Sequence, residues 1–218
     1  MNWRGKYQAM MKIMNDCCRR NSKNYDWLIF YEIDEFIYLH DYKNIKFFLN
    51  QMKYNNCQQI YLNLVCHTDN NLLYYDERPL SMRFPEIVPN TKLAGKLLEI
   101  KSIIRGHING VNITSNHLGD FTLKSCNNTG ANVKPNSIST YNIDQKYYYI
   151  DHYYSKSTEE FITKITKGDA IRNDPEYKYE RINKYFIQSE ITKEKLDLLE
   201  NKTHLNLDYY RKKYVKLL

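Results

Sequence analysis

The stretch that decides the fold class runs from Trp27 to Phe36 and has the sequence WLIFYEIDEF. Its first five residues are apolar or aromatic, a pattern typical of a short strand that is buried on both faces. The run stops abruptly at an acidic segment that contains Glu32, Asp34 and Glu35. Because ligands of open α/β sheets bind just beyond the carboxyl ends of the strands, this segment is a candidate binding site.

Helices and strands alternate around this stretch. Apolar residues at helical spacing predict helices over residues 6–19 and 44–53. Another helix is predicted after Ser157, because Glu160 completes a capping box and Gly168 stands where a left-handed cap would end the helix. The remaining patterns predict strands at 59–65, 100–105 and 147–150 and a helical tail at 191–218. The alternation predicts an α/β fold with a mainly parallel sheet flanked by helices.

Composition limits the class of protein. The 218 residues suffice for one sizeable core and are expected to form a single domain. The formal charge of +7 comes from scattered lysines, which are typical of a solvated surface, so no nucleic-acid partner is expected. Five cysteines without paired CxxC spacing predict free thiols in a reducing compartment. Without a signal peptide or a long apolar stretch, the expected location is the cytoplasm, that of the host cell if a virus encodes the chain.

The acidic segment has two interpretations. Carboxylates two residues apart can converge on a hard divalent cation, which in turn holds the phosphate oxygens of a nucleotide diphosphate. The other interpretation is a strand that ends in solvated acids. We expect Trp27, Phe36 and Ile37 to bury both sides of the segment, and buried carboxylates need a partner. This expected burial favours the metal site and leaves the second interpretation open.

Several segments resemble motifs of family-two and family-ninety-two glycosyltransferases, which have the A-type fold. Residues 27–36 are similar to their hydrophobic strand and DxDEF segment, and residues 101–105, KSIIR, resemble their K-S-I-V-R strand. Residues 152–168 resemble their H-Y-x-x-K-[ST]-x-E-E-F-x-x-K-x-x-x-G signature. Residues 63–84 are similar to a segment that some bacterial and viral members carry next to the acceptor site. The motifs occur in the expected order over nearly the whole chain, and this ordered set is specific.

The resemblance implies an incomplete A-type, Rossmann-like glycosyltransferase fold. Family members begin with strands that seat the nucleotide base, whereas this chain starts almost directly with the helix before the DxD strand. Residues 1–218 are therefore expected to form one glycosyltransferase-like catalytic domain that lacks the usual N-terminal nucleotide-binding strands.

The resemblance also implies a metal site for Mn²⁺ or Mg²⁺. Asp34 matches the metal-binding aspartate of the DxD motif, and Glu32 stands where the family usually has its first Asp. His152 matches the histidine that completes the metal site in many A-type enzymes. A histidine beside tyrosines can equally be a structural hydrogen bonder.

Three cations and two carboxylates complete the expected site. Lys101, Arg105 and Lys156 are expected to neutralise the diphosphate of the donor, with ordinary surface charge as the alternative role. If the reaction inverts the sugar, a carboxylate must take a proton from the acceptor hydroxyl, and Asp69 and Asp120 are the candidates. Either of them can equally be a turn former that bonds its own backbone.

The expected function is metal-dependent transfer of a sugar from a nucleotide-diphosphate donor to a glycan or other hydroxyl acceptor, by an inverting enzyme of the hexosyltransferase type. Four tyrosines are expected to stack on sugars, and His117 is expected to line the acceptor pocket; the tyrosines are Tyr74, Tyr75, Tyr153 and Tyr154. The alternative is a non-catalytic remnant of such an enzyme that binds a carbohydrate or a partner. The sequence gives no indication of the oligomeric state.

Overall fold

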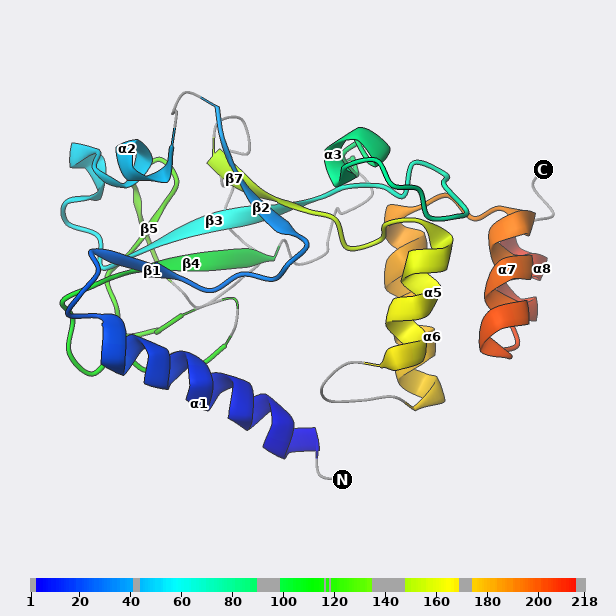
Figure 1. Cartoon of the computed structure of the whole chain (residues 1–218), viewed down its shortest axis with the longest axis horizontal. Helices are drawn as coiled ribbons and strands as arrows, with labels where there is room; N and C mark the ends of the chain where they lie inside the picture. Colours follow the sequence, from blue (N-terminus) through cyan, green and yellow to red (C-terminus); the bar gives the residue numbers. More distant parts are fainter. Residues whose placement is uncertain are drawn as a thin grey trace. The chain divides into compact units, whose positions relative to one another are not determined.

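A computed structural model describes residues 3–40, 44–89, 99–115, 117, 119–134, 148–168 and 174–214 (Figure 1). The chain divides into two compact units. The sheet unit consists of residues Gly5–Val65 and Gly95–His152, and the helical unit consists of Met1–Arg4, Cys66–Ala94 and Tyr153–Leu218.

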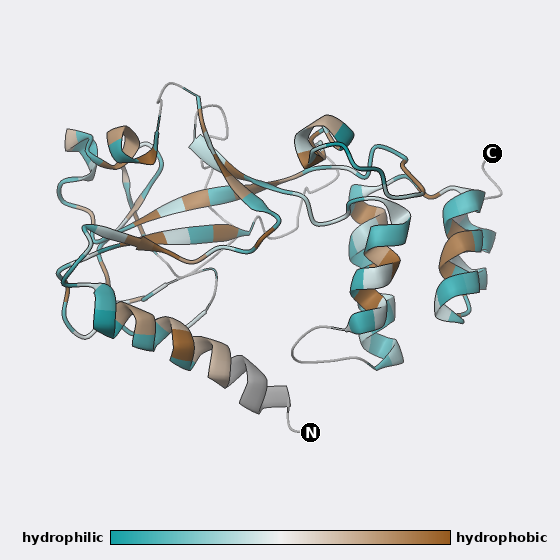
Figure 2. Cartoon of the chain, viewed as in Figure 1, coloured by the Kyte–Doolittle hydropathy of each residue, from teal (hydrophilic) through white to brown (hydrophobic). Residues whose placement is uncertain are grey.

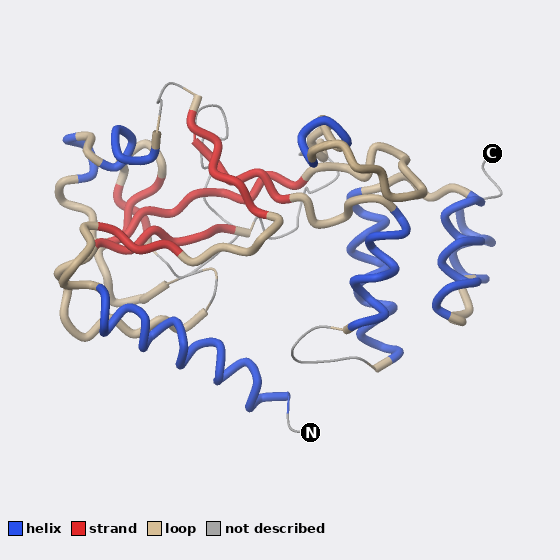
Figure 3. The backbone as a smooth tube through the Cα atoms, viewed as in Figure 1, coloured by secondary structure: helices blue, strands red, loops and turns tan. Residues whose placement is uncertain are grey.

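The sheet unit is built on a mixed sheet of seven strands, drawn in red in Figure 3. The strands are β1 (Trp27–Ile29), β2 (Glu35–Leu39), β3 (Gln59–Cys66), β4 (Ile100–Arg105), β5 (Ser125–Asn127), β6 (Asn132–Val133) and β7 (Tyr148–His152). Their order is β1-β4-β3-β5-β6, and β7 pairs with both β2 and β3. The predicted strands at 59–65, 100–105 and 147–150 are confirmed as β3, β4 and β7.

The prediction of a mainly parallel sheet is wrong for the described strands. Among the pairings with a defined register, β3 with β5 is parallel, whereas β1–β4, β3–β4, β2–β7 and β5–β6 are antiparallel. Alternating helices and strands suggest parallel crossovers, but β4 returns beside β3 in the opposite direction, which the local pattern does not encode. The fold is a mixed α/β fold with helices beside the sheet.

The two faces of the central strands carry different cores. Ile60, Leu62 and Leu64 alternate along β3 and pack into one core with Ile103 of β4 and Phe48. Figure 2 shows the hydrophobic residues gathered on β3 and β4. The other face of β4 carries Ile104, which belongs to a second core. Strands β3 and β4 therefore bury both faces, as their unbroken apolar runs predict.

Helix α1 (Trp3–Asn21) supplies the cover for this second core. Met11, Met14 and Cys18 lie at helical spacing and pack with Ile104. The predicted helix at 6–19 is thereby confirmed. The predicted helix at 44–53 is shorter than expected, because α2 (Ile45–Leu49) ends at Asn50 and a 3₁₀ turn, η1 (Met52–Tyr54), follows.

A disulfide joins Cys57 and Cys126 within the sheet unit. Cys57 lies just before β3, Cys126 lies in the neighbouring strand β5, and the two are 69 residues apart in sequence. The prediction that all five cysteines are free thiols is therefore wrong, because pairing over this separation leaves no spacing signal. Cys17, Cys18 and Cys66 are free.

The helical unit packs its helices around aromatic and leucine side chains. Its helices are α3 (Leu80–Arg83), α5 (Thr158–Lys167), α6 (Pro175–Gln188), α7 (Lys193–Thr203) and α8 (Asp208–Tyr214). Phe161 of α5 stacks on Tyr185 of α6, and Leu196 and Leu199 of α7 complete the core. The predicted capping box of Ser157 and Glu160 is present, and Gly168 ends α5 with a positive φ of 71°.

The predicted helical tail at 191–218 is confirmed in part: it consists of two helices, α7 and α8, and residues 215–218 lie outside the described residues. The sequence analysis did not predict α3 and α6. None of the helices in the described residues combines the length and apolar composition that a membrane crossing requires.

Candidate functional site

The acidic segment forms the turn between β1 and β2 in the sheet unit. The Glu35 amide donates to the Glu32 carbonyl at 3.1 Å, and the Glu32 amide donates to Oε2 of Glu35 at 2.8 Å. These reciprocal bonds close the turn and place Asp34 and Glu35 in the interior, with Glu32 half-exposed. We call Glu32, Asp34 and Glu35 the acidic turn. The expected cover by Phe36 is wrong, because its side chain is exposed.

Lys101 supplies the positive charge at the acidic turn. Its Nζ lies 3.1 Å from Oε1 of Glu35 and 3.3 Å from Oε1 of Glu32. The Lys101 side chain is 1% exposed and that of Glu35 is fully buried, whereas that of Glu32 is 52% exposed. Charges that are removed from water require such pairing. The Lys101 ammonium therefore pairs with two carboxylates, the fully buried one of Glu35 and the solvent-facing one of Glu32.

His152 lies directly beside the acidic turn. In the antiparallel β2–β7 pair, His152 is the register partner of Glu35, so both side chains point to the same face of the sheet. Nδ1 of His152 lies 4.0 Å from Oε2 of Glu99, a half-buried carboxylate just before β4. The structure thus brings together Glu32, Asp34 and His152, the three residues predicted to form the metal site, at one edge of the sheet.

The pKa values of the two glutamates shift in opposite directions. Burial raises the pKa of Glu35 and outweighs its hydrogen bond from the Glu32 amide and its attraction to Lys101. Burial would also raise the pKa of Glu32, but the Lys101 ammonium and His152 hold it below its ordinary value. Glu32 is therefore the carboxylate of this pair that keeps its charge most strongly.

His117 belongs to the same neighbourhood. Its Nδ1 lies 3.1 Å from the Ile100 carbonyl, and its pKa is lowered by burial and by the nearby charge of Lys101. Because a carbonyl oxygen only accepts, Nδ1 is the donor, and Nε2 of the neutral imidazole is then an acceptor. Its predicted role in an acceptor pocket stays a prediction.

The chemistry of the acidic turn fits a metal ion only in part. Carboxylate oxygen and imidazole nitrogen are ligands that Mn²⁺ accepts, and Mg²⁺ is commonly held by one or two carboxylates together with substrate phosphates. Within the described ranges, however, no three His, Cys, Asp or Glu side chains are arranged to hold a metal. Glu32 is also shared with Lys101. The acidic turn thus offers only a partial set of metal ligands.

Arg105 lies away from the acidic turn, at the opposite end of β4 from Lys101. Its Nε donates to the Cys57 carbonyl at 2.7 Å and its Nη2 to the Tyr54 carbonyl at 2.6 Å, while the guanidinium stacks over Trp27. These contacts fasten the disulfide-bearing segment to β4. They give Arg105 a structural role in place of the expected diphosphate contact. Lys156 belongs to the helical unit and has a positive φ of 53°.

The two predicted catalytic aspartates are buried and engaged in hydrogen bonds. Asp120, in the sheet unit, accepts from the amides of Asn112 and Thr122 and from the Thr122 hydroxyl, which lower its pKa despite its burial. Bonding to the backbone two residues ahead is the behaviour of a turn former. The alternative interpretation given for Asp120 thus fits its contacts.

Asp69 lies in the helical unit, in a sealed polar cluster. Its Oδ2 is 2.6 Å from Nζ of Lys195 and accepts a 2.5 Å hydrogen bond from the Tyr185 hydroxyl. Its Oδ1 accepts from the Asn71 amide at 3.2 Å. Both oxygens are therefore engaged. Asp69 belongs to the helical unit, whereas the acidic turn belongs to the sheet unit.

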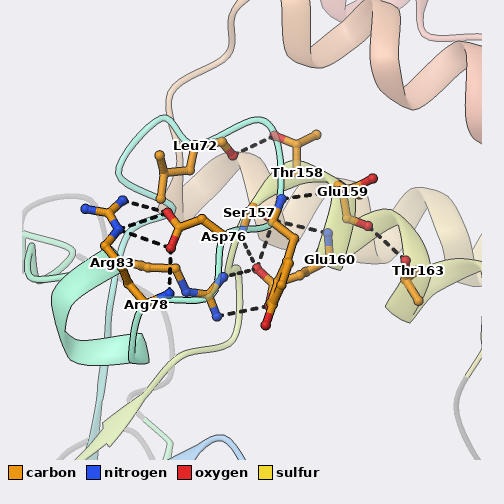
Figure 4. A network of polar contacts seen from close by, with 10 residues as sticks. Leu72, Asp76, Arg78, Arg83, Ser157, Thr158, Glu159, Glu160 and Thr163 are labelled. Carbon is orange, nitrogen blue, oxygen red and sulfur yellow. Dashed lines mark hydrogen bonds and ion pairs between the residues drawn. The ribbon is translucent and has the colours of Figure 1, made fainter.

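A second polar network of the helical unit fixes the segment before α3 to the start of α5 (Figure 4). Arg83 pairs with Glu160 through both Nη atoms at 2.6 and 3.3 Å, and Ser157 donates to the same carboxylate at 2.8 Å. The Thr158 amide donates to the Leu72 carbonyl at 3.0 Å. These contacts tie the segment and the end of α3 to the start of α5.

This segment exposes two of the four tyrosines that were predicted to stack on sugars. Tyr74 and Tyr75 are exposed, and the Tyr75 amide donates to Glu159 at 2.9 Å. Tyr153 and Tyr154 are buried, so the prediction is wrong for this second pair. Tyr153 stacks on His67, and Tyr154 packs in the helical core.

A cleft beside α1 contains none of the predicted site residues. It has a volume of about 770 Å³ and is lined by α1 and the loop at 108–112, including Lys12, Arg19 and Asn112. The cations on its wall are exposed, and Arg19 is paired with Asp16. We therefore place the candidate site at the acidic turn, where chemistry-bearing groups converge.

Sequence reasoning missed Glu99 and Lys195 as partners in these clusters. Lys195 gives no local signal, because it begins a helix like any solvated lysine. Glu99 precedes a predicted strand, and only the sheet register brings it to His152.

A mixed sheet flanked by helices, with acids and a histidine at one edge, is compatible with a glycosyltransferase fold. The model of glycosyltransferase family 92 matches residues 1–188 of the chain. The chain therefore belongs to glycosyltransferase family 92, and sugars are the substrates that this family suggests. No curated protein matches the chain.

Proposed function

We propose that the protein transfers a sugar from a nucleotide-diphosphate donor to a hydroxyl of a glycan or similar acceptor, with Mn²⁺ or Mg²⁺ as cofactor. The observation that carries the proposal is the register of β2 and β7, which sets His152 opposite Glu35 beside Glu32 and Asp34. Membership of glycosyltransferase family 92 supplies the reaction class. Hexosyl transfer with inversion belongs to the proposal, on the resemblance of the motifs.

In this proposal Asp34, Glu32 and His152 hold the metal together with diphosphate oxygens. The metal, when bound, would neutralise charge on the leaving diphosphate. Lys101 keeps Glu35 neutralised and so lets the turn remain folded around its buried carboxylate. Lys156 keeps its proposed role in donor binding.

An inverting transfer also needs a carboxylate that takes the proton of the acceptor hydroxyl. A base must have an accessible oxygen within hydrogen-bond reach of that hydroxyl. Asp69 is sealed by Lys195 and Tyr185, and both oxygens of Asp120 accept hydrogen bonds from Asn112 and Thr122. We therefore assign the base to neither residue.

The second candidate is a non-catalytic carbohydrate-binding or partner-binding member of the family. The observation that favours it is the ion pairing of Lys101, which already provides a cation at the acidic turn. This alternative predicts glycan binding that does not depend on metal.

Hydrolysis of a panel of nucleotide sugars with Mn²⁺ tests the proposal, with Asp34→Asn compared to the wild type. Asp26→Asn is the matched control, because Asp26 is an exposed aspartate of the sheet unit outside the acidic turn. We expect Asp34→Asn to lose turnover while its circular dichroism spectrum and melting temperature stay near those of the control. Equal turnover in both variants would remove the metal role of Asp34. A wild type without turnover and without a joint shift by metal and nucleotide diphosphate in melting temperature would support the alternative.

A further inference from the structure

The acidic turn contains one carboxylate that is fixed and one that can move. The fixed one is Glu35: one oxygen accepts from the Glu32 amide at 2.8 Å and the other lies 3.1 Å from Lys101. Its side chain is fully buried. The other is Glu32, whose half-exposed side chain reaches the same ammonium at 3.3 Å. Glu32 reaches solvent and Lys101 keeps Glu35 as a partner, so Glu32 can leave Lys101 at small cost.

Lys101 itself cannot follow Glu32. Its position is set by β4, where it is the register partner of Leu62 in the centre of the sheet, and its side chain is buried. Any cation that takes Glu32 therefore binds beside an ammonium that stays with Glu35. Two positive charges at such a separation repel each other, and the repulsion is stronger in a partly buried place than in water.

The charge of the turn still leaves room for a second cation. Lys101 offers one positive charge to Glu32 and Glu35, and Asp34 adds a third carboxylate whose charge is felt at Glu32. The negative charge of the turn thus attracts a cation, but the Lys101 ammonium already pairs with two of the carboxylates.

We propose that Lys101 competes with a divalent metal ion for Glu32: its ammonium holds Glu32 in the turn until the metal takes this carboxylate. The inference rests on the proposed metal site and adds to it a residue that lowers the affinity for metal. Lys101 is then a positioning residue, and a free chain binds metal weakly. An incoming diphosphate offsets the repulsion because it brings negative charge.

Titration calorimetry with Mn²⁺ alone tests this competition, because it needs neither the donor nor turnover. We expect Lys101→Met to bind Mn²⁺ about tenfold more tightly than the wild type, since a nearby positive charge is removed. Lys124→Met is the matched control: Lys124 is an exposed lysine of the sheet unit, just before β5. It changes the net charge equally and should leave the affinity unchanged.

Lys101→Met leaves Glu35 without its counter-charge, so the double variant Lys101→Met with Glu35→Gln is measured in parallel. It removes the buried charges together and should retain the tighter Mn²⁺ binding with a melting temperature closer to that of the wild type. Equal affinity in the wild type and both Lys101 variants would overturn the competition and leave the metal site standing. Weaker binding in both would show that Lys101 organises the turn for metal, and it would also overturn the inference. Absence of Mn²⁺ binding from every variant would overturn the inference together with the metal part of the proposed function.

Discussion

Each of the two units contains a buried lysine paired with a buried carboxylate. In the sheet unit Lys101 lies 3.1 Å from Glu35, and in the helical unit Lys195 lies 2.6 Å from Asp69. Both lysines are 1% exposed. Burial and charge alone do not tell the two pairs apart.

The two pairs differ in their access to solvent. Lys195 and Asp69 are enclosed by Tyr185 and Asn71, whose hydrogen bonds satisfy the remaining polar atoms. Lys101 instead reaches a half-exposed carboxylate, Glu32, and has acids and a histidine as neighbours. A sealed pair can only hold elements together, whereas an open pair can exchange a partner. Candidate sites are therefore better identified by the path to solvent than by buried charge.

The largest effect is expected in the sealed pair. Lys195→Met leaves the Asp69 carboxylate buried without its cation, and breaking a buried pair from one side costs about 3–5 kcal/mol. We expect a loss of this size in urea unfolding of the helical unit, followed by tyrosine fluorescence. Lys193→Met, an exposed lysine at the start of the same helix, is the control and should change stability by less than about 0.5 kcal/mol. A loss below about 1 kcal/mol for Lys195→Met would show that the pair is not sealed.

The disulfide gives the next largest effect and is the sheet unit's own cross-link. Cys57→Ser opens a covalent loop between residues 69 apart, and the loss of such a cross-link typically costs about 2–5 kcal/mol. Thermal unfolding without reductant should show the loss, and Cys17→Ser, a free cysteine, should not. If mass spectrometry of the intact wild type gives a mass that is two hydrogens higher than expected for a protein with one disulfide, the cross-link is contradicted.

How far the sequence predicts these features depends on their range. The capping box of Ser157, the strand at 100–105 and the acidic turn were predictable, because each is encoded by residues within one element. The order and direction of the strands in the sheet and the pairing of Cys57 with Cys126 were not predictable, because both depend on which distant segments become neighbours.

The candidate site shows the same limit. The acids and His152 were predicted from motifs, and the β2–β7 register sets His152 opposite Glu35, the last residue of the acidic turn. That Lys101 stands between Glu32 and Glu35 was not predicted, because nothing in a strand sequence says which face of the sheet will carry a carboxylate. Asp69 was a candidate catalytic base from the sequence, because nothing local shows its pairing with Lys195, which lies more than a hundred residues later.

A smaller effect on stability is expected for the sealed pair at alkaline pH. Burial and the adjacent Asp69 raise the pKa of Tyr185 well above the ordinary value near 10. A raised pKa means that the stabilisation by this hydroxyl is complete below the ordinary pKa and is lost as the pH rises toward the folded-state value. Between pH 10 and 11, Tyr185→Phe should therefore remove a pH-dependent loss of up to about 1.4 kcal/mol per pH unit. Chemical denaturation of both variants at pH 8 and 10.5 measures it, with the exposed Tyr74→Phe as control. Parallel curves for all three proteins would exclude a buried Tyr185–Asp69 bond.

The smallest stability effect belongs to the open pair, and it is the sharpest test of the comparison. Glu32→Gln removes the ion pair between the half-exposed Glu32 and Lys101, which keeps Glu35 as its partner, so the free energy of unfolding should fall by less than about 1 kcal/mol at pH 7. Because the pKa of Glu32 is below its ordinary value, its small contribution is present above that ordinary value and is lost as the pH falls through the folded-state pKa. The wild type and Glu32→Gln should thus converge in melting temperature at pH 3. Isothermal titration at pH 7 should nevertheless show that Glu32→Gln binds Mn²⁺ at least tenfold more weakly, a difference of about 1.4 kcal/mol. If Glu32→Gln loses stability but keeps its metal affinity, Glu32 is a structural residue, like the residues of the sealed pair.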